Sequence, residues 1–97
     1  MKIITFLSDF GSKSSYVSQM KGIALCMTDA KLIDISHEIT PHNICEGAFV
    51  LKTSVPHFPM GTVHVGVVDP GVGNNISKTI DINYLPHYTF IFYFSNF

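Results

Sequence analysis

The feature that most constrains this chain is an alternation of short apolar runs with segments of helical periodicity. Apolar runs rich in β-branched residues at 3–7, 31–35 and 62–68 predict three strands. Apolar residues recur every three or four positions over 15–28 and 44–54, which predicts two helices between the strands. This order is typical of an α/β fold, a doubly wound and mainly parallel sheet with flanking helices. The near-continuous apolarity of 62–68 further predicts that this strand is buried on both faces.

Composition and charge limit the classes of partner. The chain has 97 residues, of which 46% are hydrophobic and 13% charged, so we expect one globular domain over 1–97. Its six basic residues are scattered and the net charge is -1, which argues against a nucleic-acid partner. No apolar run approaches the ~20 residues of a membrane span. We therefore expect no membrane partner and a cytoplasmic location.

The two cysteines and the aromatic residues near the end of the sequence lead to further predictions. Cys26 and Cys45 form no CxxC pair, so we expect two small buried hydrophobic side chains rather than a disulfide or a structural zinc site. Residues 78–82 could form another strand. The segment 88–97 contains six aromatic residues in ten, and an exposed strand of that kind would be prone to aggregation. We expect a longer protein to continue there, or a partner chain to cover it.

Two acidic residues mark a candidate ligand site. Asp9 follows the first predicted strand and Asp69 follows the third, at the strand ends where α/β sheets bind ligands. A carboxylate there can accept hydrogen bonds from vicinal ribose hydroxyls, while Gly11, Gly71 and Gly73 allow a close approach of the backbone. The spacing alone leaves the alternative open that Asp9 caps a turn and 69–71 is an ordinary tight turn.

Six ordered sequence blocks point to one family. They are Ser8-Asp9-Phe10-Gly11; Tyr16-Val17 with Met20-Lys21-Gly22; Asp34-Ile35-Ser36-His37-Glu38-Ile39; Glu46-Gly47-Ala48-Phe49-Val50-Leu51; Phe58-Pro59-Met60-Gly61-Thr62-Val63-His64; and Val67-Val68-Asp69-Pro70-Gly71-Val72-Gly73. In order and spacing the chain resembles the S-adenosylmethionine (SAM) hydroxide adenosyltransferase family, which is related to the SAM-dependent fluorinase and chlorinase. The resemblance covers roughly 3–75.

The resemblance implies an activity and a set of site residues. The activity is that of a SAM hydrolase, in which a water-derived nucleophile displaces methionine from C5' of SAM and adenosine forms. SAM is the substrate, and no metal or other cofactor is expected. Asp69 is the catalytic candidate, as one member of an Asp-Arg-His set that polarises the attacking water. The substrate-binding candidates are Asp9, which would hold the ribose hydroxyls, with Phe10, Gly11, Tyr16 and His42.

The chain also departs from the family pattern. Ile76 stands where the arginine of the set is expected, and the nearby Lys78 does not reproduce a planar guanidinium fork. The histidine of the set comes from later in the family sequence, and Ser14 stands where an aspartate is usual. The family places its site between this N-terminal domain and the C-terminal domain of a neighbour in a homotrimer, a domain we expect to be absent here. The alternative to a SAM hydrolase is therefore a truncated, inactive domain that binds adenosine or SAM, or associates with other subunits.

Two further motifs are weak. His37-Glu38 could open a zinc motif, but that motif needs a second histidine at the position of Pro41, so we expect loop hydrogen bonds instead. Gly71-Val72-Gly73 is followed by Ile76 where a dinucleotide-binding fingerprint has its third glycine, which argues against NAD.

Overall fold

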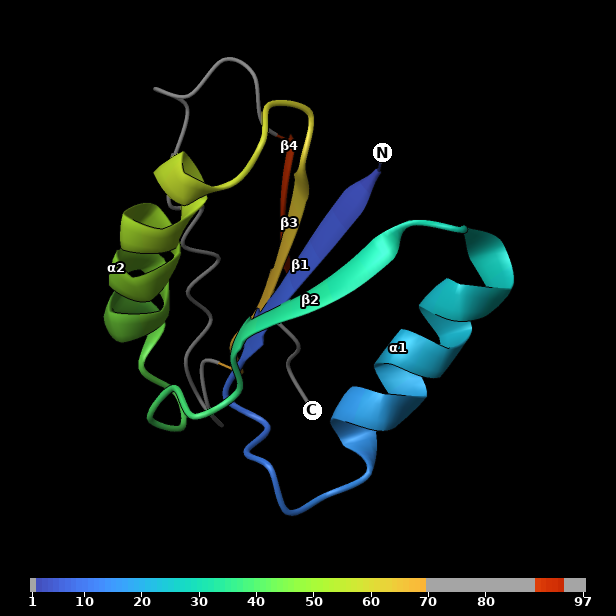
Figure 1. Ribbon diagram of the computed structural model, residues 1–97. Coiled ribbons are helices and arrows are strands. Elements are labelled where there is room, and N and C mark those ends of the chain that lie inside the picture. The colour runs from blue at the N-terminus through green and yellow to red at the C-terminus, as the bar shows by residue number, and fades with distance from the viewer. Residues whose placement is uncertain (1, 70–88, 94–97) are drawn as a thin grey trace.

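The computed structural model describes residues 2–69 and 89–93, and within them it shows a parallel sheet with one helix on each side (Figure 1). The strands are β1 (Ile3–Ser8), β2 (Lys31–Ser36), β3 (Val63–Val67) and β4 (Thr89–Tyr93), and the helices are α1 (Tyr16–Met27) and α2 (Ile44–Ser54). A short 3₁₀ turn, Val55–His57, follows α2. The predicted α/β fold with a parallel sheet is confirmed, and the expected element bounds differ by one residue at most.

The strand order places a topological switch point between β1 and β3. The sheet order is β2-β1-β3-β4, and all three pairings are parallel. The chain leaves β1 through α1 and enters β2, which lies next to β1 on the side away from β3. The next described strand after β3 is β4, which lies next to β3 on the side away from β1. Neighbouring strands whose connections diverge leave a crevice at their carboxyl ends, where α/β proteins bind ligands. Ser8 pairs with Val67 at the ends of the two strands, so Asp9 and Asp69, which follow them, both lie at this crevice.

The apolar core lies between the sheet and α2. Its buried side chains are Leu7, Ile39, Leu51, Val55 and Val68. Asn43 caps the N-terminus of α2, and its side chain accepts a hydrogen bond from the Glu46 backbone N–H at 3.0 Å. The helix approaches the sheet at the buried Gly47, where an added Cβ would lie 3.0 Å from Cγ2 of Val68. The close packing of α2 therefore depends on that glycine.

Replacement of Gly47 by valine should destabilise the fold by about 1–3 kcal/mol, the usual effect of overpacking a core. The matched control is Gly22→Val in α1, where a Cβ would meet nothing within 4 Å. Valine and glycine differ by only about 0.3–0.4 kcal/mol in helix propensity, so the control should stay within about 0.5 kcal/mol of wild type. Urea unfolding measures both free energies, and equal effects at the two positions would contradict this packing.

Helix α1 confirms the helix predicted over 15–28, but its side chains are not part of the buried core. No residue of α1 is buried, and Tyr16, Ile23 and Met27 are 61%, 64% and 81% exposed. The expectation that Cys26 and Cys45 are buried is also wrong, because both lie on exposed helix faces. Periodicity identified the helix, but an apolar stripe does not show what covers it.

Strand β3 is buried more on one face than on the other, contrary to the expectation for 62–68. His64 is fully buried, while the neighbouring Val63 and Val65 are only partly buried. The Nδ1 atom of His64 lies 2.6 Å from the Thr5 hydroxyl of β1, and its ring meets the Phe58 ring edge-on with centroids 5.5 Å apart. A polar side chain is thus built into the sheet, where burial lowers the pKa of the imidazole.

The stability of the chain should fall between pH 7.5 and pH 5.5, in part because of His64. Above the ordinary histidine pKa of about 6.5 both states hold the neutral ring. As the pH falls below that value the unfolded chain takes up a proton, whereas the folded chain, with its lowered pKa, resists. His64→Asn should flatten this pH dependence in urea unfolding, and the exposed His57→Asn should not. A pH dependence unchanged by His64→Asn would contradict the assignment.

The aromatic-rich segment contributes backbone to the sheet. Thr89–Tyr93 pairs in parallel with β3 and ends the described strand order. The possible strand at 78–82 lies outside the described residues. Across 2–69 and 89–93, no helix has both the length and the apolarity that crossing a membrane requires.

Candidate functional site

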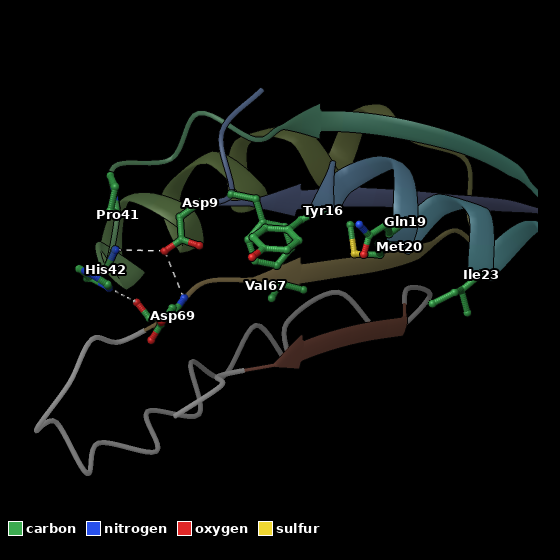
Figure 2. Close-up of a pocket in the computed structure, with 10 residues that line it drawn as sticks. Asp9, Tyr16, Gln19, Met20, Ile23, Pro41, His42, Val67 and Asp69 are labelled. Atoms are coloured by element: carbon green, nitrogen blue, oxygen red, sulfur yellow. Dashed lines mark hydrogen bonds between the residues drawn. The ribbon is translucent and has the colours of Figure 1, made fainter. Parts of the chain in front are cut away.

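The carboxylate of Asp9 joins the three loops that meet at the carboxyl end of the sheet. Its Oδ2 atom accepts hydrogen bonds from the backbone N–H of His42 at 3.1 Å and of Asp69 at 3.2 Å. These two amides come from the loop before α2 and the loop after β3 (Figure 2). Both contacts use Oδ2, so the second oxygen, which Figure 2 shows directed toward Tyr16, is not used in them. Asp9 therefore shapes the crevice and also presents a carboxylate oxygen to it.

His42 closes the same end of the crevice in a strained backbone conformation. Its φ of 68° lies in the left-handed region, which non-glycine residues seldom adopt and which often occurs at functional sites. Its Nδ1–H donates to the backbone carbonyl oxygen of Asp69 at 2.9 Å. The ring and the backbone of His42 thus hold Asp9 and Asp69 side by side.

A pocket of about 760 Å³ opens beside these residues, within the range of about 300–1,000 Å³ typical of small-molecule sites. It is lined by Asp9, Phe10, Tyr16, Gln19, Met20, Ile23, Pro41, His42, Val67 and Asp69. Acidic residues lie at one end and the apolar side chains of α1 at the other (Figure 2). Phe10 and Tyr16 meet edge to face with ring centroids 5.9 Å apart. A pocket that has carboxylates at one end and two aromatic rings in its apolar lining suits a ligand with a sugar joined to a flat ring.

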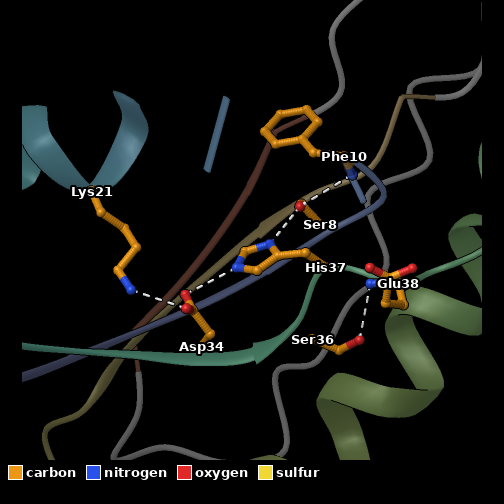
Figure 3. Close-up of polar contacts among 7 residues, drawn as sticks. All are labelled: Ser8, Phe10, Lys21, Asp34, Ser36, His37 and Glu38. Carbon is orange, nitrogen blue, oxygen red and sulfur yellow. Dashed lines mark hydrogen bonds and ion pairs between the residues drawn. The ribbon is translucent and has the colours of Figure 1, made fainter. Parts of the chain in front are cut away.

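A second group of polar side chains lies behind the turn after β1 (Figure 3). His37 Nδ1 lies 2.6 Å from the Ser8 hydroxyl, and His37 Nε2 lies 2.9 Å from Asp34 Oδ1. Lys21 of α1 donates to Asp34 Oδ2 at 2.9 Å. Partial burial acts to raise the pKa of Asp34, but the hydrogen bonds from His37 and Lys21 and the positive charge of Lys21 outweigh it and lower that pKa.

Comparison with known proteins identifies the family. The sequence model of the SAM hydroxide adenosyltransferase N-terminal domain matches residues 4–91. The chain belongs to this family. It is 52% identical over 79 residues to an (R)-S-adenosyl-L-methionine hydrolase of Methanocaldococcus jannaschii, a match that covers 76% of this chain and 30% of that protein. It is 33% identical over 84 residues to a fluorinase of Actinopolyspora mzabensis, which covers 84% of this chain and 28% of that protein.

Solved structures agree with this assignment. A conserved hypothetical protein from Thermus thermophilus superposes with a TM-score of 0.69 at 35% identity, over 76% of this chain and 32% of that one. An uncharacterized conserved protein from Thermotoga maritima gives a TM-score of 0.68 at 41% identity, over 74% and 28% of the two chains. The chain thus spans about 30% of the length of the curated hydrolase it matches.

The structure brings together five of the six candidates that the family resemblance named. Asp9, Phe10, Tyr16, His42 and Asp69 all line the pocket. Gly11 does not line the pocket, and its backbone N–H donates to the His37 carbonyl oxygen at 2.7 Å. Its φ of 74° lies in the left-handed region, which glycine adopts without steric cost. Gly11 is therefore a turn residue next to the site. The positions of Gly71, Gly73, Ile76 and Lys78 lie outside the described residues.

The sequence interpretation missed the contribution of α1 to the pocket. Met20 and Ile23 follow Tyr16 at helical spacing, and they line the pocket together with Gln19. The signal was present, because these residues lie one and two turns beyond a residue already named as a ligand contact. Pro41 and Val67, each next to a named residue or strand end, also line it.

Proposed function

We propose that this pocket binds the adenosyl group of SAM and forms the nucleoside half of an adenosine-forming SAM hydrolase site. The observation that carries the proposal is the Asp9 carboxylate, fixed by two backbone amides at the end of a pocket lined with aromatic residues. Relatives named (R)-S-adenosyl-L-methionine hydrolase, from several organisms, support the same substrate class.

The geometry suits a nucleoside in two respects. The remaining oxygen of Asp9 can accept hydrogen bonds from the 2'- and 3'-hydroxyls, and bonds to a charged acceptor contribute about 1.5–3 kcal/mol. The aromatic pair Phe10 and Tyr16 offers a surface for the adenine, and stacking of a base on an aromatic side chain is worth about 1–3 kcal/mol. No cofactor is part of this proposal.

In the proposed reaction Asp69 orients a water for attack at C5'. The new C5'–O bond forms as the C5'–S bond breaks, the electron pair leaves with the methionine sulfur, and the water gives its proton to the Asp69 carboxylate. The sulfonium is already an activated leaving group, so the chain's main task is to hold the water in line with the breaking bond. In this proposal a second domain from a neighbouring subunit of a homotrimer completes the site.

A binding role without turnover is the second candidate, and the sequence favours it at one position. Ile76 stands where the family has the arginine of the water-polarising set. An apolar side chain there cannot hold a carboxylate or a water by hydrogen bonds. A chain that keeps Asp9 and the pocket but lacks this group can still bind an adenosyl ligand.

Adenosine should bind at least about tenfold more tightly than 2'-deoxyadenosine, because the deoxynucleoside loses one hydrogen bond to a charged acceptor. Isothermal titration calorimetry with the 97-residue chain measures both affinities. The Asp9→Ala variant is the control, since the preference for the ribose should disappear with the carboxylate. Equal affinities of wild type for the two nucleosides would contradict the role of Asp9, and no binding of either would contradict the proposed ligand.

A further inference from the structure

His37 holds both ends of the short turn that carries Asp9 and Phe10 into the pocket. Its ring contacts the Ser8 hydroxyl at 2.6 Å, and its backbone carbonyl accepts from the Gly11 N–H at 2.7 Å. Ser8 Oγ in turn accepts from the Phe10 N–H at 3.2 Å. We propose that His37 is a positioning residue that fixes the 8–11 turn, and with it the nucleoside contacts of Asp9 and Phe10. The functional part of this inference rests on the proposed function.

The hydrogen bonds assign the protons in this group. Ser8 is fully buried, so its O–H needs an acceptor, and His37 Nδ1 at 2.6 Å provides one. The proton of the neutral ring is then on Nε2 and is donated to Asp34. Asp34 also binds Lys21, which lies on the helix that supplies Tyr16 and Met20 to the pocket (Figure 3). A series of hydrogen bonds through Ser8, His37, Asp34 and Lys21 therefore connects the turn after β1 to α1.

The same geometry excludes Ser8 as a nucleophile. A serine, a histidine and an aspartate in hydrogen-bonded sequence could suggest the triad of a hydrolase. The Ser8 side chain has no exposed surface, however, and its oxygen already accepts from the backbone N–H of Phe10. A substrate cannot reach that oxygen, so the group supports the turn rather than reacting.

Two substitutions distinguish the roles of the two ring nitrogens of His37. The Oδ1 atom of asparagine can occupy the place of histidine Nδ1, so His37→Asn keeps an acceptor for Ser8 but loses Asp34. The Nε2 atom of glutamine can occupy the place of histidine Nε2, so His37→Gln keeps a donor for Asp34 but loses Ser8. If His37 positions the turn through Ser8, asparagine should preserve the turn and glutamine should not.

The test is amide hydrogen exchange of the full 97-residue chain by NMR, followed by titration with adenosine. His37→Gln should accelerate exchange of the Phe10 amide about tenfold, the effect of one lost hydrogen bond, and should weaken adenosine binding about three- to tenfold. His37→Asn should stay within about threefold of wild type in both, as should the neighbouring Glu38→Gln.

Other outcomes separate this inference from the proposed function. Equal effects of His37→Asn and His37→Gln, or no change at Phe10, would overturn the positioning role. If wild type does not bind adenosine but Phe10 exchange still differs between the two variants, the control of the turn is supported and the proposed ligand is wrong. If His37→Gln does not fold, His37→Leu provides the same comparison with His37→Asn, because leucine also removes the acceptor for Ser8 and should accelerate Phe10 exchange about tenfold.

Discussion

The 97-residue chain, incubated with SAM, should release no adenosine above the level of a control without protein. Water is a weak nucleophile, and fixing it in line with the bond that breaks can contribute about 7–11 kcal/mol. In the proposed reaction Asp69 shares that task with the arginine of the water-polarising set. By the family resemblance Ile76 stands where that arginine is expected, and an apolar side chain cannot hold a water by hydrogen bonds.

Asp69 alone should not retain partial activity, because residues that act as a unit lose most of their effect when one is removed. Chromatography of the reaction mixture measures adenosine directly. Clear turnover by wild type that disappears in Asp69→Asn would contradict this expectation. It would show that another group, such as Lys78 or a neighbouring copy of the chain, supplies what Ile76 cannot.

Replacement of Asp9 by alanine should weaken adenosine binding by about 1.5–3 kcal/mol, roughly 10- to 150-fold, through loss of the charged acceptor. The loss has two physical sources. The ribose hydroxyls lose their partner, and the backbone amides of His42 and Asp69 lose the acceptor that holds their loops together. Calorimetric titration of the variant with adenosine measures the change.

Two further variants distinguish these sources. Asp9→Asn keeps an oxygen that can accept from the His42 and Asp69 amides, so it should preserve the loops and lose only the contribution of the charge. Asp29→Ala removes an aspartate between α1 and β2, away from the pocket, and should leave the affinity unchanged. An Asp9→Ala variant that binds adenosine as tightly as wild type would show that Asp9 serves only the turn.

The fold was largely predictable from the sequence because its signals are local. Short apolar runs rich in β-branched residues mark β1, β2 and β3, and spacings of three and four residues mark both helices. The environment of α1 was not predictable in the same way. Its side chains at Tyr16, Met20 and Ile23 line an open pocket rather than the core, and the periodicity of apolar residues is the same in both cases.

The candidate site was predictable only at residues whose position in the sequence points to it, such as acidic residues that directly follow predicted strands. Asp9 and Asp69 stand at the ends of two strands that prove to be neighbours, so the topology brings them to one crevice. The support of the turn by His37 could not be predicted, because it joins Ser8, Lys21 and Asp34 from three different elements. Loop hydrogen bonds were the correct expectation for His37, but their partners depend on the three-dimensional arrangement.

The central claim, that the crevice between β1 and β3 binds an adenosyl group, is tested most directly by an NMR titration of the ¹⁵N-labelled chain with adenosine. We predict saturable shifts of the Asp9, Phe10, Tyr16, His42 and Asp69 amides, with little change at Gly47 and Leu51 in the core on the opposite side of the sheet. Shifts confined to other residues, or no saturable shift at millimolar adenosine, would contradict the claim.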